Sequence, residues 1–372
     1  MDKPRDYATE LREILNRRAN GRTIWQPRIL CWYSDRRYRM EEFPGRFRGV
    51  DSERELFKRL GISNRLYEFT YCINYKSDDP GIRYEKRKID DLTDEHFIHT
   101  KKGSVNAIYR RNLSNGAERE MKWWVETPND LEVFMYIEEN RQYAFDRGVY
   151  DQKMETWGPM GLPGVHIPRV NIQKMFIELC GVENTIYLLN DYPDTVEAFF
   201  ESVNRSNMRF VEMLCDTPYE WVNFGDNIHS KIVSPKLFEK YVLPHYLERN
   251  EKLHAAGKFT CAHFDGDVKE LFPYFRECGL DGIEAITPLP QGDVTLKEAK
   301  DALGDMFLID GIAAILFEEN YPLKMLRRQA EECMHLFEGQ LVMGISDEIS
   351  SHGTMDRIEY VAELVEDFNA KR

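Results

Sequence analysis

The sequence predicts an α/β protein that folds as one (β/α)₈ barrel. From about residue 185 onward, short apolar runs alternate with amphipathic helical stretches, which is typical of a parallel sheet. Five strand candidates fall within about 130 residues, and a helical pattern follows each of them. The units of roughly 25–35 residues suit a barrel and also an open doubly wound sheet. The 372 residues are enough for one large barrel with an insertion.

The C-terminal half supplies the clearest elements. Ser234 is a plausible N-cap, Pro235 fits a first helical turn, and Gly257 suits a C-terminal cap, so 234–258 is predicted to be helical. The pattern indicates further helices at 194–214, 268–279, 296–304, 322–339 and 354–372. The predicted strands are 220–227, 258–266, 282–288, 306–312 and 341–347.

The N-terminal half is less regular. The run QPRILCWY at 26–33 is predicted to be the first strand, and a second strand region is expected near 153–164, before a helix at 171–180. Four segments alternate apolar or aromatic residues with charged ones, as exposed antiparallel strands do: 67–75, 81–88, 104–111 and 118–124. We therefore expect a single domain over 1–372 with an antiparallel β insertion at about 65–125.

Composition excludes several classes of partner. The formal charge of −14 repels nucleic acid, and the first twenty-three residues contain no apolar run that would serve as a signal peptide. The longest nearly apolar stretch, 306–317, contains Asp310 and is too short to cross a membrane. The seven cysteines form no C-x-x-C pair, which favours reduced, mostly buried thiols. A soluble cytoplasmic enzyme is expected, and base rates favour a homodimer.

Polar residues end or interrupt the late strands, where α/β barrels carry their active sites. Asp226 and Asn227 end one strand, His263 and Asp265 another, Asp310 and Asp347 end two more, and Glu284 interrupts the remaining one. Several carboxylates and an imidazole gathered at one end of the barrel need a counter-charge, and a divalent cation is the simplest one. Two alternatives stay open: the aspartates cap the following helices, and His263 is a hydrogen-bonded core residue.

Residues around the end of the predicted first strand are candidates for substrate contact. Trp32 and Tyr33 end that strand and offer aromatic faces, while Arg36 follows as a cation. The alternative is that the two aromatic residues belong to the core.

The segments HFDG, GLDGIEA, GDV and GISD, together with QPRILCWY and the GDN at 225–227, resemble the superfamily of uroporphyrinogen decarboxylase and the corrinoid-dependent methyltransferases. The resemblance runs from about Ile24 to the C-terminus and implies a distorted (β/α)₈ barrel. The decarboxylases carry R-Q-A-G-R after the first strand, where arginines bind substrate carboxylates. This chain has WYSDRRYRM there and also lacks their F-x-D-I aspartate, which argues against porphyrinogen decarboxylation.

The methyltransferase branch carries H-x-C at the position of His263–Asp265 and a further cysteine near Asp347. This chain keeps the histidine and has carboxylates at both cysteine positions. The resemblance thus implies metal ligation by His263, Asp265 and Asp347. Oxygen donors in place of thiolates make a harder, more Lewis-acidic zinc centre, which suits an ether oxygen better than a thiol. Loss of zinc along with the cysteines is the alternative.

The resulting hypothesis is a methyltransferase that demethylates a methoxylated small molecule. Cobalamin would arrive on a separate corrinoid protein, because the chain lacks a D-x-H-x-x-G corrinoid motif. In this hypothesis Asp226 and Glu284 are catalytic, and Trp32, Tyr33, Arg36 and Asn227 bind substrate. Two alternatives remain: a metal-independent decarboxylase of a small acid anchored by Arg36 or Arg37, and a non-catalytic tetrapyrrole-binding relative.

Overall fold

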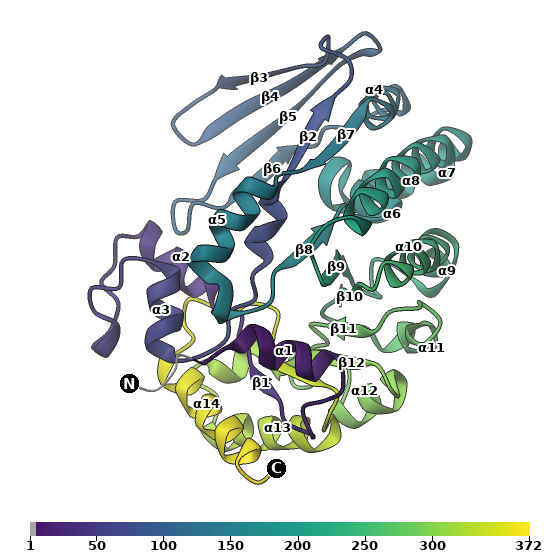
Figure 1. Cartoon of the computed structure of the whole chain (residues 1–372). Helices are drawn as coiled ribbons and strands as arrows, with labels where there is room; N and C mark the ends of the chain where they lie inside the picture. The colour runs from purple at the N-terminus through teal and green to yellow at the C-terminus, as the bar shows by residue number, and fades with distance from the viewer. Residues whose placement is uncertain (1–4) are drawn as a thin grey trace.

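A computed structural model describes residues 5–372 and contains a curled parallel sheet of seven strands (Figure 1). The strand order is β1-β13-β12-β11-β10-β9-β8. Their bounds are β1 Ile24–Trp25, β8 Gly164–Ile167, β9 Trp221–Ile228, β10 Phe259–Phe264, β11 Gly282–Glu284, β12 Phe307–Ala313 and β13 Leu341–Ser346. The predicted barrel is confirmed, with seven of its eight positions occupied by strands.

An irregular extended segment, residues 62–66, occupies the eighth position between β1 and β8. Ser63 donates its backbone N–H to Trp25 O at 3.3 Å, on the β1 side. On the β8 side, Gly164 N donates to Leu66 O at 3.2 Å, and Leu66 pairs with Pro163 in a parallel bridge. The chain therefore closes the barrel without forming a regular strand there.

Helices surround the sheet and one helix closes its amino-terminal end. Helix α1 (Tyr7–Leu15) begins at Asp6, whose side chain accepts a hydrogen bond from Thr9 N. It packs Tyr7, Leu11 and Ile14 against an apolar layer inside the barrel, formed by Ile24, Leu162, Trp221, Cys261, Phe307, Ile309 and Val342. The remaining barrel helices are α2 Leu30–Tyr38, α3 Glu53–Leu60, α5 Arg147–Trp157, α6 Asn171–Lys174, α7 Gly181–Asp191, α8 Pro193–Cys215, α9 Pro235–Tyr241, α10 Leu243–Ala255, α11 Phe272–Phe275, α12 Leu296–Leu303, α13 Leu323–Leu336 and α14 Met355–Asn369.

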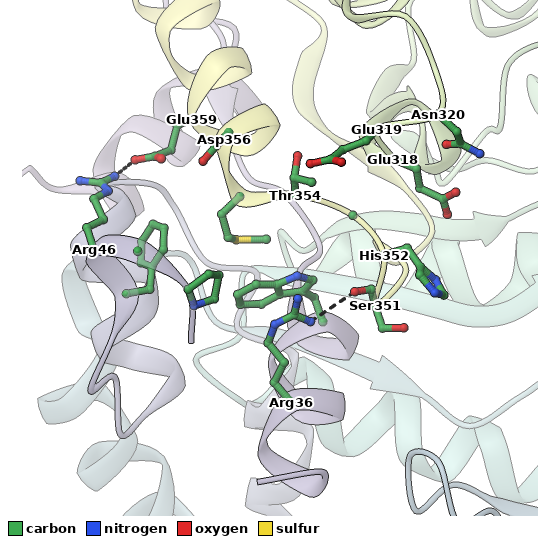
Figure 2. Close-up of a pocket in the computed structure, with 16 residues that line it drawn as sticks. Arg36, Arg46, Glu318, Glu319, Asn320, Ser351, His352, Thr354, Asp356 and Glu359 are labelled. Carbon is green, nitrogen blue, oxygen red and sulfur yellow. Dashed lines mark hydrogen bonds and ion pairs between the residues drawn. The ribbon is translucent and has the colours of Figure 1, made fainter. Parts of the chain in front are cut away.

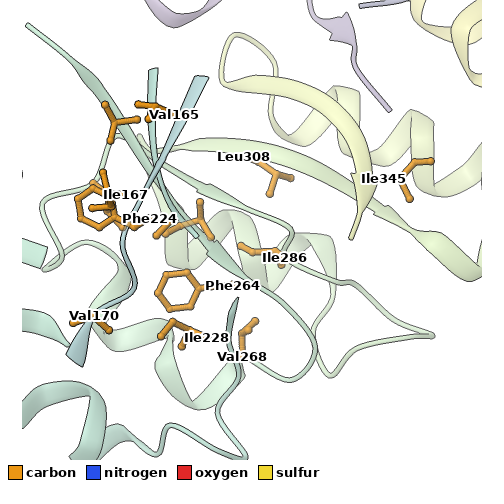
Figure 3. Packing of buried hydrophobic residues seen from close by; sticks show 14 of the residues in the cluster. Val165, Ile167, Val170, Phe224, Ile228, Phe264, Val268, Ile286, Leu308 and Ile345 are labelled. Atoms are coloured by element: carbon orange, nitrogen blue, oxygen red, sulfur yellow. The ribbon is translucent and has the colours of Figure 1, made fainter. Parts of the chain in front are cut away.

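The outer face of the sheet is apolar, as a sheet covered by helices requires. Figure 3 shows Phe224, Ile228, Phe264 and Val268 packed together in this layer. Ser234 caps α9 as predicted, and Gly257 adopts the left-handed conformation that ends α10. No helix within residues 5–372 is long and apolar enough to cross a membrane.

The predicted β insertion is present and is set apart from the barrel in Figure 1. Strands β3 Arg83–Lys88, β4 Thr93–Thr100, β5 Gly103–Arg111 and β6 Glu118–Lys122 form an antiparallel sheet. Strand β2 (Ile73–Ser77) pairs instead with β7 (Arg141–Phe145), after helix α4 (Pro128–Glu139). This pairing carries the β-rich region beyond residue 125.

Two N-terminal strand predictions were wrong, and a third, 67–75, was wrong over Tyr67–Cys72, which form a 3₁₀ helix before β2. The run 26–33 is not a strand, because β1 ends at Trp25 and helix α2 begins at Leu30. Pro27 has no N–H to continue the ladder, which explains the early end. In the region 153–164, α5 continues to Trp157 and β8 begins only at Gly164.

We expect Gly344→Ala to unfold the protein at a lower denaturant concentration, because a methyl group at this position would overlap Asp310 Oδ1 and lie 2.9 Å from Gln26 O. Forced overpacking of this kind costs about 1–3 kcal/mol. Gly158→Ala is the control, since its methyl group would have no neighbour nearer than 3.9 Å. Equal unfolding midpoints for both variants in urea would contradict this packing.

Candidate functional site

A polar layer lies inside the barrel, one step above the apolar layer. Side chains two residues apart on a strand share a face, so Trp221 and Cys261 of the apolar layer are followed by Asn223 and His263. The members of the polar layer are Gln26, Arg65, Tyr67, Asn223, His263, Glu284 and Asp310. Polar groups replace packed apolar ones toward the carboxyl ends of the strands, where α/β barrels place their chemistry.

Arg65 lies at the centre of this layer and bridges two strands. Its guanidinium contacts Glu284 Oε1 at 2.8 Å and both carboxylate oxygens of Asp310, at 2.7 and 3.0 Å. The side chains of all three are at most 5% exposed. Gln26 Oε1 accepts the remaining Nε hydrogen at 3.1 Å. Arg65 thereby neutralises carboxylates that would otherwise be buried without a counter-charge.

Glu284 is the most heavily hydrogen-bonded carboxylate of the site. Oε1 accepts from Arg65 and from Tyr67 Oη at 2.7 Å, and Oε2 accepts from Asn223 Nδ2 at 2.7 Å. His263 Nδ1 lies 2.8 Å from the same Oε2. Burial by itself would raise the pKa of Glu284, but the charge of Arg65 and the His263 hydrogen bond hold that pKa well below its usual range.

Because Glu284 is ionised, it can only accept, and His263 Nδ1 must be the donor. In the neutral imidazole, Nε2 of His263 is then the nitrogen without hydrogen. It is buried and has no hydrogen-bond partner among the described residues. Two buried polar atoms of this network, His263 Nε2 and Asn223 Oδ1, have no hydrogen-bond partner among the described residues, and of the two only Nε2 belongs to an imidazole that can bind a metal.

Asp310 reaches Arg65 through an unusual backbone. Ile309 belongs to the apolar interior layer, yet the next residue also points inward, which an ordinary strand does not allow. The φ of +85° at Asp310 makes this possible. Burial raises the pKa of Asp310 to about 6 even though Arg65 opposes the rise, since Arg65 is shared with Glu284. Asn227, Ala285 and Asp347 also have positive φ values, at the carboxyl ends of β9, β11 and β13.

Of the three predicted metal ligands, the structure keeps Asp265 and Asp347 near His263. Burial and the nearby negative charge of Asp347 raise the pKa of Asp265, against the opposing effect of His263 when its ring is protonated. Asp347 Oδ1 lies 3.7 Å from Arg28 Nη1, which is also 3.5 Å from His263 Nδ1. Since both of these nitrogens carry hydrogen, the Arg28–His263 approach is a contact and not a hydrogen bond.

The donor types suit a hard divalent cation: one unpartnered imidazole nitrogen and two neighbouring carboxylates. Within residues 5–372, however, no three His, Cys, Asp or Glu side chains are gathered closely enough to hold a metal ion. A metal bound at Nε2 would therefore require Asp347, whose side chain is 52% exposed, to leave Arg28. The donor types of the predicted ligands thus suit a divalent cation, and among them His263 Nε2 is the atom already placed to bind it.

Asp226 and Asn227, the two predicted site residues at the end of β9, have different surroundings in the structure. Both oxygens of Asp226 are occupied, by Val170 N at 2.7 Å and Tyr246 Oη at 2.7 Å, and the residue is buried. These contacts join β9 to helix α10 through Tyr246 and to the start of α6 through Val170, and a catalytic role for Asp226 would have to break one of them. Asn227 is exposed and lies 3.3 Å from Arg169 Nη1.

Two of the predicted substrate residues line a groove of about 910 Å³ beside α2, shown in Figure 2. Arg36 lies over the ring of Trp32, 4.1 Å from its centroid, and donates to Ser351 O at 3.2 Å. The buried indole Nε1 of Trp32 has no hydrogen-bond partner among the described residues. Tyr33 instead stacks on Phe43, so the structure separates it from this groove.

Sequence reasoning missed Arg28, Arg65, Tyr67, Asn223 and His166. His166 lies in β8, one residue before its end, and packs against the Tyr67 ring, with centroids 4.1 Å apart. Burial lowers the pKa of His166 to about 4, so the ring is neutral at pH 7. Asn223 was detectable as a polar residue in the predicted strand 220–227. Arg65 lies in an irregular segment without a periodic signal, and Tyr67 begins the segment 67–75, whose alternation predicted an exposed strand where the structure has a 3₁₀ helix over Tyr67–Cys72.

A family model described as uroporphyrinogen decarboxylase (URO-D) matches residues 175–368, which are 194 of the 372 residues. No curated protein sequence matches the chain at a significant level. A methyltransferase from Methanosarcina mazei is similar in structure, with a TM-score of 0.51 and 11% identity over 70% of this chain and 75% of that one. A candidate vitamin-B12-independent methionine synthase from Listeria monocytogenes gives a TM-score of 0.42 at 13% identity, covering 94% and 97% of the two chains. At 11% identity, the first similarity establishes a shared fold.

We expect Arg65→Met to destabilise the protein by about 3–5 kcal/mol, because it leaves Glu284 and Asp310 buried without their cation. Neutralising both carboxylates in the same chain, as Arg65→Met/Glu284→Gln/Asp310→Asn, should recover a large part of that loss. Arg12→Met is the control, since its ion pair with Glu220 is exposed and worth about 1 kcal/mol or less. Urea unfolding measures all three, and a loss no larger for Arg65→Met than for Arg12→Met would refute the role of Arg65.

Proposed function

Because the chain belongs to the uroporphyrinogen decarboxylase family, we propose that it is a methyltransferase of that family that uses a divalent metal, zinc first among candidates. It would move a methyl group from a methoxylated small molecule to a separate corrinoid protein. The observation that carries the proposal is His263 Nε2, a buried nitrogen that no described residue hydrogen-bonds and whose ring is held by a charged carboxylate. This carboxylate–histidine arrangement is the one in which proteins present imidazole to metals.

His263, Asp265 and Asp347 are the residues that would hold the ion. Their one nitrogen and two oxygen donors form a hard ligand set without thiolate. Bound there, a divalent ion supplies Lewis acidity that lowers the basicity of an ether oxygen as it departs. The other product is an alkoxide or phenolate, which takes up a proton, and the methyl group passes to the reduced cobalt of the carrier.

The chain's own residues perform the remaining tasks. Glu284 fixes the orientation of His263, and Asp265 supplies negative charge beside it. Arg36, which lies over the buried Trp32 indole, offers a guanidinium at a groove large enough for a small aromatic compound. The fold-level similarity to a methyltransferase structure is compatible with this proposal and does not identify a substrate.

A second candidate, decarboxylation of a small acid, is favoured by one observation at Arg28. Its side chain is 20% exposed, yet its nearest charged contacts are Glu348 at 3.5 Å and Asp347 at 3.7 Å. Its guanidinium makes no hydrogen bond shorter than 3.5 Å to another described residue. A guanidinium with unfilled donors next to His263 suits a substrate carboxylate.

Metal analysis and a transfer assay separate the two candidates. Protein purified without chelator should contain near one zinc per chain, and His263→Ala should lose most of it. Asp265→Ala and Asp347→Ala should each lower occupancy with the fold intact. His99→Ala, which removes an imidazole from the β insertion, is the control that should keep the metal.

The assay mixes protein, reduced corrinoid carrier and a panel of methoxylated aromatic and aliphatic compounds, and follows methylation of cobalt in the visible spectrum. We expect methylation that chelation abolishes and that is faster for more acidic leaving phenols. Release of carbon dioxide from a small acid without metal, with no compound methylating the carrier, would establish the decarboxylase instead.

A further inference from the structure

We infer that Tyr67 and Asn223 are positioning residues that act through Glu284 to keep the proton of His263 on Nδ1. The inference rests on the proposed function in that Nε2 is the atom left free for a metal. It assigns Glu284 to orienting His263, in place of the catalytic role that the sequence suggested. Neither Tyr67 nor Asn223 has to touch substrate for this task.

The hydrogen-bond directions around Glu284 admit one arrangement. Asn223 Nδ2 donates one hydrogen to Glu284 Oε2 at 2.7 Å and the other to Tyr67 Oη at 2.6 Å. Reversing the Asn223 amide would place its oxygen against the carboxylate, acceptor against acceptor. Tyr67 Oη accepts from Asn223 and therefore has its own hydrogen available for Glu284 Oε1.

The four hydrogen-bond donors around Glu284 fill the acceptor capacity of its carboxylate. Arg65 and Tyr67 supply two hydrogens to Oε1, while Asn223 and His263 supply two to Oε2. Two acceptor sites per oxygen is the capacity of an ionised carboxylate. Glu284 thus stays charged and fixed in place, and only a protonated Nδ1 suits the remaining position.

The surrounding packing holds Tyr67 and Asn223 to this geometry. The Tyr67 ring lies between His166, at 4.1 Å, and Trp221, at 6.4 Å between centroids. Gly164 makes room for it, because a Cβ at that position would lie 2.7 Å from the ring. Asn223 lies on β9 beside β10, with its backbone paired to Cys261, two residues before His263.

A purely structural role would predict loss of stability with no change in His263. The test is therefore the tautomer of His263, read from ring ¹⁵N shifts in protein labelled at histidine and assigned with His263→Gln. The wild-type protein, metal-free, should show a protonated Nδ1 and an unprotonated Nε2. Tyr67→Phe, which keeps the ring, and Tyr67→Phe/Asn223→Ala should show increasing amounts of the other tautomer.

Tyr219→Phe is the matched control, since it removes another buried tyrosine hydroxyl, bonded to Phe69 O outside this network. Its His263 signals should be those of the wild type. Should the double variant not fold, Glu284→Gln serves in its place, because a neutral amide no longer demands a donor at Nδ1. An unchanged tautomer in Tyr67→Phe and Glu284→Gln would overturn the inference.

Zinc affinity gives the second readout. Loss of a hydrogen-bonding partner behind a metal-ligating histidine typically lowers affinity about 10–100-fold, and we expect a loss in that range for Tyr67→Phe/Asn223→Ala by competition with a chromophoric chelator. If the tautomer shifts as expected and the wild-type protein binds no zinc, the proposed function fails while the positioning role stands. If zinc binds and the tautomer does not respond to these variants, the positioning role fails alone.

Discussion

The ion pairs from Arg65 to Glu284 and Asp310 are the interaction on which the site depends. A buried guanidinium between two carboxylates is tolerable only when each charge has its partner, so the three side chains must stay together. Arg65 comes from the segment that closes the barrel, while its partners lie on β11 and β12. The segment that closes the barrel therefore also orients Glu284, through Arg65. Glu284 in turn orients His263 through its hydrogen bond to Nδ1.

Because side chains two residues apart share a face of a strand, the barrel interior is divided into layers of different polarity along its axis. The amino-terminal layer is apolar and sealed by α1, the next layer is the charged network, and Arg28, Asp265 and Asp347 surround His263. Positive φ values at Asn227, Ala285, Asp310 and Asp347 show where the backbone leaves ordinary strand geometry. Such conformations cost about 1–3 kcal/mol each and persist where surrounding contacts impose them. Here the Arg65 pairs supply those contacts at Asp310.

Periodicity predicted the βα units after residue 185, because apolar strands and amphipathic helices leave a clear pattern there. It failed at 26–33, where apolar residues that look like a strand belong to helix α2, and at 62–66, where the barrel closes without a regular strand. Glu284 and His263 were found because polar residues inside apolar strands demand an explanation. Arg65 and Tyr67 could not be found that way, since their importance comes from contacts with residues more than 200 positions away. Asp226 illustrates the opposite problem. It was predicted to be catalytic because it is polar and lies at a strand end, but its two oxygens accept hydrogen bonds from Val170 and Tyr246.

Anomalous diffraction at the zinc absorption edge, from crystals of the unmodified chain grown with zinc, tests the central claim most directly. The account predicts one peak about 2.0–2.1 Å from His263 Nε2, with Nδ1 still bonded to Glu284 and the Arg65 pairs intact. Zinc bound to Nδ1 or directly to Glu284, or no peak at His263 at all, would contradict it.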